Sequence, residues 1–254
     1  MPDAGDLRRI VLVHGGVHGA WCWEELTPLL TARGFDVAAP DLPAHGSDRT
    51  PPREVSLDSY VQRVVETVRD GETPVLLVGH SLGGAVISQV GEDIPDEIGG
   101  LVYLAAMMLA DGEAISSFRA GDLVAERERT AARGFMPGQD GAHAIDPNQA
   151  IDIFYNTSPP DAAARAVARL CPEPDRPLTD PVRLSEARWG GLRKTYVVCT
   201  RDQAIPPARQ RFLAGRRAEN EVRELESDHS PFYTCPALLA DLLARVCRDA
   251  GGSA

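Results

Sequence analysis

Residues 75–84 read Val75-Leu76-Leu77-Val78-Gly79-His80-Ser81-Leu82-Gly83-Gly84. The four apolar residues at the start form a short continuous run, which is typical of a strand buried on both faces of a parallel sheet. The residues after Ser81 continue in a helical pattern to Val90. Between strand and helix, residues 79–83 match the pattern G-x-S-x-G, which places a serine in a tight turn at a helix N-terminus, where developing negative charge is favoured. We therefore predict that Ser81 is a nucleophile; an ordinary serine in a glycine-rich turn is the alternative.

The chain on both sides of this stretch alternates short apolar runs with helical patterns. Strands are predicted over Ile10–Val13, Val37–Ala39, Val75–Val78, Leu101–Leu104, Thr195–Cys199 and Val222–Leu225. Helices are predicted over Trp21–Arg33, Leu57–Arg69, Leu82–Val90, Pro206–Ala214 and Pro236–Arg248. This alternation predicts a doubly wound α/β fold with a mostly parallel sheet.

The alternation stops between Met107 and Leu192. This stretch contains Asp-Gly, Pro-Gly and Pro-Pro pairs and isolated prolines, with a helical pattern over Asp161–Leu170. It is too long for a simple loop in a compact domain. We expect residues 1–106 and 193–254 to form the core, and residues 107–192 to form an inserted cap.

Composition narrows the classes of function. The chain has 26 Lys and Arg against 37 Asp and Glu, a formal charge of −11, which disfavours nucleic acids and anionic membrane surfaces as partners. No apolar run approaches the roughly 18 residues of a membrane span, and the N-terminus lacks the pattern of a signal peptide. The five cysteines form no C-x-x-C pair, so we expect a reduced, cytoplasmic protein.

Two cofactor signals are absent from the sequence. The glycine-rich loop after the first predicted strand lacks the spacing G-x-G-x-x-G of a dinucleotide site. The six histidines offer no H-E-x-x-H or comparable metal-ligand spacing. We therefore expect neither a cofactor nor a metal.

A serine nucleophile needs a base and an acid to orient it. Of the six histidines, His229 is best placed, because it lies between the last predicted strand and the last predicted helix. In a sheet of this kind the order along the chain is Ser, acid, His. Asp202 is the only carboxylate in the loop after the penultimate predicted strand and is the predicted acid. Asp228 is the alternative, but adjacent residues such as Asp228 and His229 seldom face each other.

The remaining catalytic element is an oxyanion hole. One donor is expected to be the backbone N–H of Leu82, the residue after the nucleophile, and the other to lie near Gly16 in the loop His14-Gly15-Gly16-Val17. The two glycines let this backbone approach a substrate carbonyl. They would equally serve a tight turn from strand to helix.

With these residues assembled, the chain resembles the methylesterase and hydroxynitrile lyase family of α/β-hydrolases, in particular its bacterial members. The matching segments are residues 14–23 (His-Gly-Gly-Val-His-Gly-Ala-Trp-Cys-Trp), 41–46 (Asp-Leu-Pro-Ala-His-Gly), 79–84, 197–206 and 228–229. The resemblance implies the α/β-hydrolase fold with an inserted cap. It also implies that Ser81, Asp202 and His229 form the triad and that Gly16 and Leu82 form the oxyanion hole.

The substrate pocket is expected between the cap and the sheet. Candidate lining residues in the insertion are Met107, Met108, Phe118, Phe135, Phe154 and Tyr155. We also expect Gly15, His18 and His80 to bind substrate. The alternative for the apolar residues is that they form a small core of the cap itself.

The favoured function is hydrolysis of a small carboxylic ester through an acyl-enzyme, with a small molecule as the partner and a homodimer left open. The alternatives are a lyase, a non-hydrolytic tailoring enzyme that uses the same triad, and a binding protein without turnover. In the family that the chain resembles, the lyases carry Thr or Asn where this chain has Gly15. One lyase branch has Glu in place of His80 and Lys in place of Ser230. These departures favour the esterase.

Overall fold

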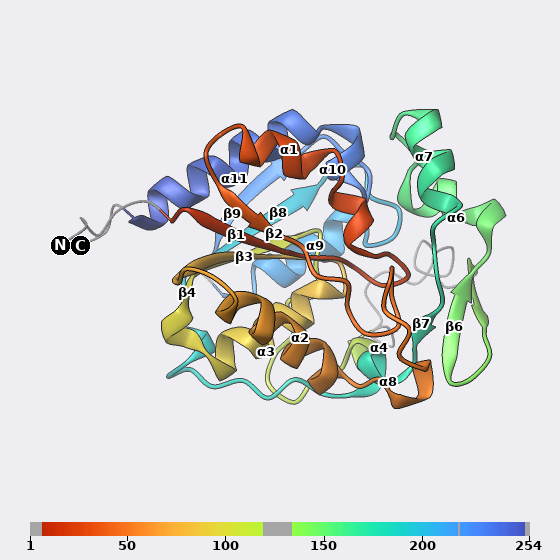
Figure 1. Ribbon diagram of the computed structural model, residues 1–254, viewed down its shortest axis with the longest axis horizontal. Coiled ribbons are helices and arrows are strands. Elements are labelled where there is room, and N and C mark those ends of the chain that lie inside the picture. The colour runs from red at the N-terminus through yellow and green to blue at the C-terminus, as the bar shows by residue number, and fades with distance from the viewer. Residues whose placement is uncertain (1–6, 119–133, 218, 252–254) are drawn as a thin grey trace.

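The main structural element is a six-stranded sheet in the order β2-β1-β3-β4-β8-β9, with every neighbouring pair parallel. The computed structural model (Figure 1) describes residues 7–118, 134–217 and 219–251. The strands are β1 (Arg9–Val13), β2 (Asp36–Ala38), β3 (Val75–His80), β4 (Ile98–Leu104), β8 (Lys194–Cys199) and β9 (Glu221–Leu225). The predicted α/β fold with a parallel sheet is confirmed.

The central strands are buried on both faces because their side chains alternate between two apolar cores. In β1, Val11 and Val13 pack into one core, whereas Ile10 and Leu12 pack into the other. The edge strand β9 differs, since three of its five residues are exposed and carry two charges. Charged side chains on an edge strand discourage pairing with another chain.

Helices cover both faces of the sheet (Figure 1). One face carries α2 (Leu57–Arg69), α3 (Gly83–Asp93) and α9 (Pro207–Ala214). The other carries α1 (Leu26–Thr31), α10 (Pro231–Thr234) and α11 (Pro236–Gly251). Short 3-10 helices span Ala20–Trp23, Pro52–Glu54, Pro95–Glu97 and Trp189–Gly191. Within the described ranges, no helix is both long and apolar enough to cross a membrane.

The predicted helix over Trp21–Arg33 is wrong in its continuity. The structure has a 3-10 helix at Ala20–Trp23 and the separate helix α1 from Leu26 to Thr31. The cause is Pro28, which has no N–H to donate to a preceding turn and is tolerated only in the first turn of a helix. A helix that includes Pro28 must therefore begin shortly before it.

The insertion forms a small second layer at one end of the large sheet. Its antiparallel sheet contains β5 (Phe135–Pro137), β6 (Ala142–Ile145) and β7 (Glu173–Pro174). Its helices are α4 (Ile115–Phe118), α6 (Pro147–Phe154), α7 (Pro160–Val167) and α8 (Arg176–Thr179). In Figure 1, α6, α7, β6 and β7 lie at the end opposite to the chain termini.

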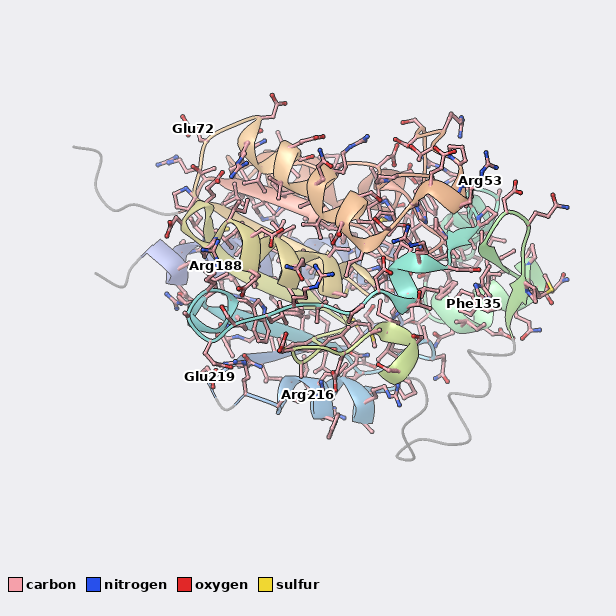
Figure 2. The ribbon with its side chains drawn as sticks, turned by 90° about the horizontal axis from the view of Figure 1, so that it is seen from below. Arg53, Glu72, Phe135, Arg188, Arg216 and Glu219 are labelled. Atoms are coloured by element: carbon pink, nitrogen blue, oxygen red, sulfur yellow. The ribbon has the colours of Figure 1, made fainter. Side chains whose placement is uncertain are left out.

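The last part of the insertion, the return segment (residues 180–192), packs on the core instead of on this small sheet. The backbone N–H and the hydroxyl of Ser185 donate to Glu92 on α3, and Trp189 Nε1 donates to the Tyr103 hydroxyl at 2.8 Å. Figure 2 shows Arg188 of this segment at the opposite end of the molecule from Phe135 of the cap. The predicted division into core and cap stays a prediction about folding units.

Candidate active site

Ser81 lies in a sharp turn between β3 and α3. Its backbone has φ of +53°, a left-handed conformation that is unusual for a residue with a side chain. Ser81 N–H donates to Leu104 O at 3.2 Å, and the N–H of Met107 donates to Ser81 O at 2.9 Å. A Cβ added to Gly79 would lie 2.5 Å from the carbonyl oxygen of Gly83, so the close crossing of this turn requires glycine. The strained serine is thus held by the backbone around it.

His229 and Asp202 are brought together from two loops that follow β9 and β8. His229 Nδ1 lies 2.6 Å from Asp202 Oδ2, and both side chains are buried. Because a carboxylate only accepts hydrogen bonds, Nδ1 carries the hydrogen and Nε2 is the nitrogen that can take a proton. The geometry matches the pairing predicted from the order of loops.

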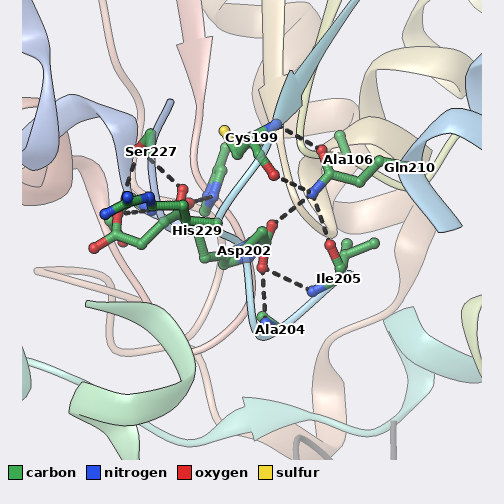
Figure 3. A network of polar contacts seen from close by, with 12 residues as sticks. Ala106, Cys199, Asp202, Ala204, Ile205, Gln210, Ser227 and His229 are labelled. Atoms are coloured by element: carbon green, nitrogen blue, oxygen red, sulfur yellow. Dashed lines mark hydrogen bonds and ion pairs between the residues drawn. The ribbon is translucent and has the colours of Figure 1, made fainter. Parts of the chain in front are cut away.

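The Asp202 carboxylate is oriented by three further donors (Figure 3). The N–H groups of Ala204 and Ile205 donate to Oδ1 at 2.7 and 2.9 Å, and Gln210 Nε2 donates to Oδ2 at 2.9 Å. Gln210 also donates to the carbonyl of Ile205. The sequence offers no signal that separates Gln210 from any other polar residue of a helix, and its contact with the acid was not predicted.

Asp228 faces the cap, although it is the neighbour of His229 in sequence. Its Oδ2 accepts from Thr157 N–H at 2.9 Å and from the Ser158 hydroxyl at 2.8 Å. Its Oδ1 accepts from Ser230 N–H and from the Thr234 hydroxyl. This carboxylate therefore joins the histidine loop to the insertion.

Residues 14–18, which we call the oxyanion loop after their predicted role, pass directly beside the turn that holds Ser81. A Cβ on Gly15 would lie 2.8 Å from Ser81 Cβ and 2.9 Å from His80 Nδ1. A Cβ on Gly16 would lie 3.6 Å from Leu82 Cδ1. Leu82 is the N-cap residue of α3, whose first N–H groups have no helical partner. The two predicted oxyanion residues, Gly16 and Leu82, are thus neighbours beside Ser81.

Two histidines brace this arrangement. His80 Nε2 donates to the backbone oxygen of His229 at 2.7 Å, and the two ring centroids are 4.5 Å apart. His18 Nδ1 donates to Gly16 O, which leaves Nε2 to accept from the hydroxyl of Tyr155 at 2.8 Å. Burial lowers the pKa of His18 to about 4, and it lowers that of His80 well below the ordinary value. Both rings are therefore neutral near pH 7.

The cap contributes an aromatic wall. The centroid of the Phe154 ring lies 5.7 Å from that of the His229 ring and 5.5 Å from that of the His18 ring. The ring centroids of Phe135 and Phe154 are 6.4 Å apart. Phe154 and Tyr155 also pack into the core between the sheet and α11. They are therefore part of the main core and not of a separate core of the cap.

Three other predicted lining residues are placed differently. Met107 is buried and adjoins Ser81 through its backbone N–H. The sulfur of Met108 accepts from Asn220 Nδ2 at 3.3 Å, on the side of α9. The side chain of Phe118 lies outside the described residues, so its predicted place in the pocket stays a prediction. Among the residues that the structure describes, no group of three or more His, Cys, Asp or Glu side chains is arranged to hold a metal ion.

Comparison with known proteins identifies the family of the chain. The model of the "Alpha/beta hydrolase family" matches residues 10–242. Methylesterase 1 of Arabidopsis thaliana is 31% identical over 264 residues, which cover 94% of this chain and 95% of that protein. Putative methylesterase 11, chloroplastic, of the same plant is 33% identical, covering 97% of this chain; the chain spans 65% of that relative's length.

Among solved structures, a pyrethroid hydrolase from Sphingobium faniae superposes with a TM-score of 0.86 at 26% identity, covering 95% of this chain and 97% of that one. The folds therefore agree over nearly the whole length of both chains. The chain belongs to the alpha/beta hydrolase family and, within it, to the methylesterase group.

Proposed function

We propose that this protein is a serine hydrolase that cleaves a small carboxylic ester through an acyl-enzyme intermediate. The observation that carries the proposal is the buried Asp202–His229 hydrogen bond of 2.6 Å beside a strained turn that holds Ser81 at φ of +53°. The similar proteins include methylesterases and a pyrethroid hydrolase, and their names support ester hydrolysis.

In the proposed mechanism, His229 Nε2 takes the proton of Ser81 as its hydroxyl oxygen attacks the ester carbonyl. Asp202 holds the imidazole and stabilises the imidazolium that forms. The backbone N–H groups of Gly16 and Leu82 donate to the negative oxygen of the tetrahedral intermediate. The alcohol leaves with the proton from His229. A water molecule then attacks the acyl-enzyme while His229 takes its proton, and Ser81 leaves with that proton as the acid is released.

The surroundings of Ser81 favour an uncharged substrate. His18 and His80 are neutral near pH 7, because burial lowers the pKa of each, and the Phe154 ring faces His229 from the cap. A neutral ester loses little solvation in such a site, whereas a carboxylate or an ammonium group would lose much more. We therefore expect aryl and methyl esters of uncharged acids to be better substrates than charged analogues.

The lyase alternative meets a steric obstacle. At Gly15, where lyases of the resembling family carry Thr or Asn, a Cβ would lie 2.8 Å from Ser81 Cβ. At the position of the lyase lysine, the chain has the buried, uncharged Ser230. Gly15 offers no side chain for a cyanohydrin hydroxyl, and Ser230 offers no charge for departing cyanide.

A cytoplasmic location and an exclusively small-molecule partner stay predictions from composition.

The experiment is a substrate panel with purified protein and Ser81→Ala as the control. We expect wild type to hydrolyse short aryl and methyl esters and the variant to lose this activity. We expect no mandelonitrile cleavage above the buffer rate. Mandelonitrile cleavage that depends on Ser81, without ester hydrolysis, would overturn the proposal, and Ser81-dependent turnover of neither substrate would favour a tailoring role on a larger metabolite.

A further inference from the structure

A buried carboxylate in the cap contacts three separate parts of the core. Glu173, in the two-residue strand β7, is 1% exposed. Its Oε2 accepts from Val17 N–H and from His45 Nε2, each at 2.9 Å, and its Oε1 accepts from the hydroxyl of Tyr60 at 3.0 Å. The donors belong to the oxyanion loop, to the loop after β2 and to α2. One side chain thus links the cap to all three.

The partner of this carboxylate is a histidine with acceptors at both nitrogens. His45 Nε2 faces Glu173, and its Nδ1 lies 3.1 Å from the carbonyl oxygen of Pro43. The Tyr60 hydroxyl lies 3.4 Å from Nδ1, but it donates its hydrogen to Glu173. Since the carboxylate and the carbonyl oxygen only accept, both ring nitrogens carry hydrogen in this geometry and the ring is a cation. Burial alone would lower the pKa of His45, but the charge and hydrogen bond of Glu173, together with the Pro43 carbonyl and the charge of Asp41, raise it. The pair is therefore a buried ion pair, and removing one member leaves an uncompensated charge.

The contact with Val17 fixes a single peptide unit of the oxyanion loop. The Gly16–Val17 peptide donates its N–H to Glu173, while its carbonyl accepts from His18 Nδ1 at 2.8 Å. Both ends of the peptide are therefore held. Val17 has φ of +58°, which is a strained conformation for a β-branched residue and persists only where its surroundings enforce it.

Glu173 also packs against Gly16 itself. A Cβ on Gly16 would lie 3.0 Å from Glu173 Oε2 and 3.6 Å from Leu82 Cδ1. Gly16 is thus enclosed between the cap carboxylate and the residue that follows the nucleophile. Its N–H orientation depends on the peptide that Glu173 holds, because the two peptide planes share the Gly16 Cα.

We propose that Glu173 is a positioning residue, which acts through Val17 to hold the Gly16 N–H in the direction of the substrate oxyanion. The inference rests on the proposed hydrolase function and deepens it. It assigns to the cap a share in transition-state stabilisation, in addition to covering the substrate.

The test compares Glu173→Ala and Glu173→Gln with Ser185→Ala. Ser185→Ala removes an insertion-to-core hydrogen bond to a carboxylate, that of Glu92, outside the oxyanion loop. We measure kcat and KM on an aryl ester and the affinity for a trifluoromethyl ketone, which forms an oxyanion on Ser81, against that for the corresponding alcohol, which forms none. Loss of one oxyanion donor lowers kcat about 10²- to 10³-fold, so a misdirected donor should lower it about 10- to 100-fold.

We expect Glu173→Ala to lower kcat and ketone affinity in parallel by about 10- to 100-fold, with KM and alcohol affinity within about threefold. Glu173→Gln, whose amide oxygen can still accept from Val17, should recover most of the loss. Ser185→Ala should keep wild-type kcat. If Glu173→Ala does not fold, Glu173→Asp decides the question, because it keeps the charge for His45 but withdraws the oxygen by one methylene; we then expect about a tenfold parallel loss.

Folded Glu173 variants with wild-type kcat and ketone affinity would overturn the inference while leaving the hydrolase proposal intact. The same holds if they lose kcat and alcohol affinity equally, since that pattern indicates general collapse of the site. Wild-type protein without Ser81-dependent ester turnover would overturn the hydrolase proposal and this inference with it.

Discussion

The two halves of the site are built in different ways. The half carried by the sheet places Ser81, Asp202 and His229 in loops that follow β3, β8 and β9, so parallel strands bring them to one edge. The half carried by the cap depends on contacts between residues far apart in sequence, such as the hydrogen bond of Val17 with Glu173, 156 residues later. The first half follows from topology, and the second follows from packing that no local pattern records.

The largest expected effect comes from the sheet half. Ser81→Ala removes the nucleophile, and we expect kcat on an aryl ester to fall about 10⁴- to 10⁶-fold while the fold is kept. A fluorophosphonate probe should label wild type and not the variant, as read by mass spectrometry. Labelling of Ser81→Ala at the wild-type rate would contradict the assignment and with it the contrast between the halves.

Asp202→Asn should come next, because an amide stabilises the wrong tautomer of His229. We expect kcat to fall about 10⁴-fold and the free energy of unfolding to fall by about 1–3 kcal/mol, because the amide turns one accepting oxygen of a buried group into a donor that faces N–H groups. Steady-state kinetics with an aryl ester measures the loss. If Asp228→Asn lowered kcat more than Asp202→Asn does, the wrong carboxylate would have been assigned to the triad.

Acid should act with opposite signs on the buried histidines around the oxyanion loop. Burial lowers the pKa of His14 to about 3 and of His18 to about 4, so the unfolded chain binds more protons below the ordinary value of 6.5. Each such histidine should reduce the free energy of unfolding by about 1.4 kcal/mol per pH unit as pH falls below about 6.5. The raised pKa of His45 acts in the opposite window: its contribution is complete below 6.5 and is lost as pH rises through the raised value.

Urea unfolding between pH 5 and pH 8 tests this difference. His18→Gln should show a shallower loss of stability between pH 6.5 and pH 5 than wild type, by about one histidine's share. Equal slopes for wild type and variant would show that His18 is not held neutral by the fold.

The smallest kinetic effect is expected at the contact between the histidine loop and the cap. Asp228→Asn keeps the size of the side chain but turns one accepting oxygen into a donor that faces Thr157 N–H, Ser158 or Thr234. We expect the free energy of unfolding to fall by about 1–3 kcal/mol and kcat to stay within about tenfold. Chemical denaturation and kinetics on the same preparation measure both.

The sequence predicted the parts of the molecule whose structure is local. The runs Ile10–Val13 and Val75–Val78 are apolar and short, so the period of the pattern identifies a buried strand without knowledge of its neighbours. The order of the loops then predicted that Asp202 pairs with His229, and the structure contains this hydrogen bond. The prediction of one helix over 21–33 was wrong because the apolar period continues across Pro28, where a helix has to begin anew.

The cap could not be predicted in the same way. Strand β7 has two residues, Glu173 and Pro174, and exists only because it pairs with β6. A glutamate beside a proline is typical of an exposed loop; here it is buried because His45 and Tyr60 supply a charge and a hydroxyl. Gln210 was missed for the same reason, since the polar contact that buries it lies on another element.

The carboxylate of Glu173 also limits how this protein can be recombined with its relatives. A cap taken from a relative and grafted onto this core would leave the His45 cation without its counter-charge unless the donor brings an acid to the same place. Conversely, this cap on a foreign core would bury an unpaired carboxylate. A library that varies residues 147–153 of α6 leaves β6, its pairing with β7, and the Glu173 contacts with Val17, His45 and Tyr60 in place. Directed evolution of substrate range should therefore diversify that helix, and should inherit β6 and positions 17, 45, 60 and 173 as one unit.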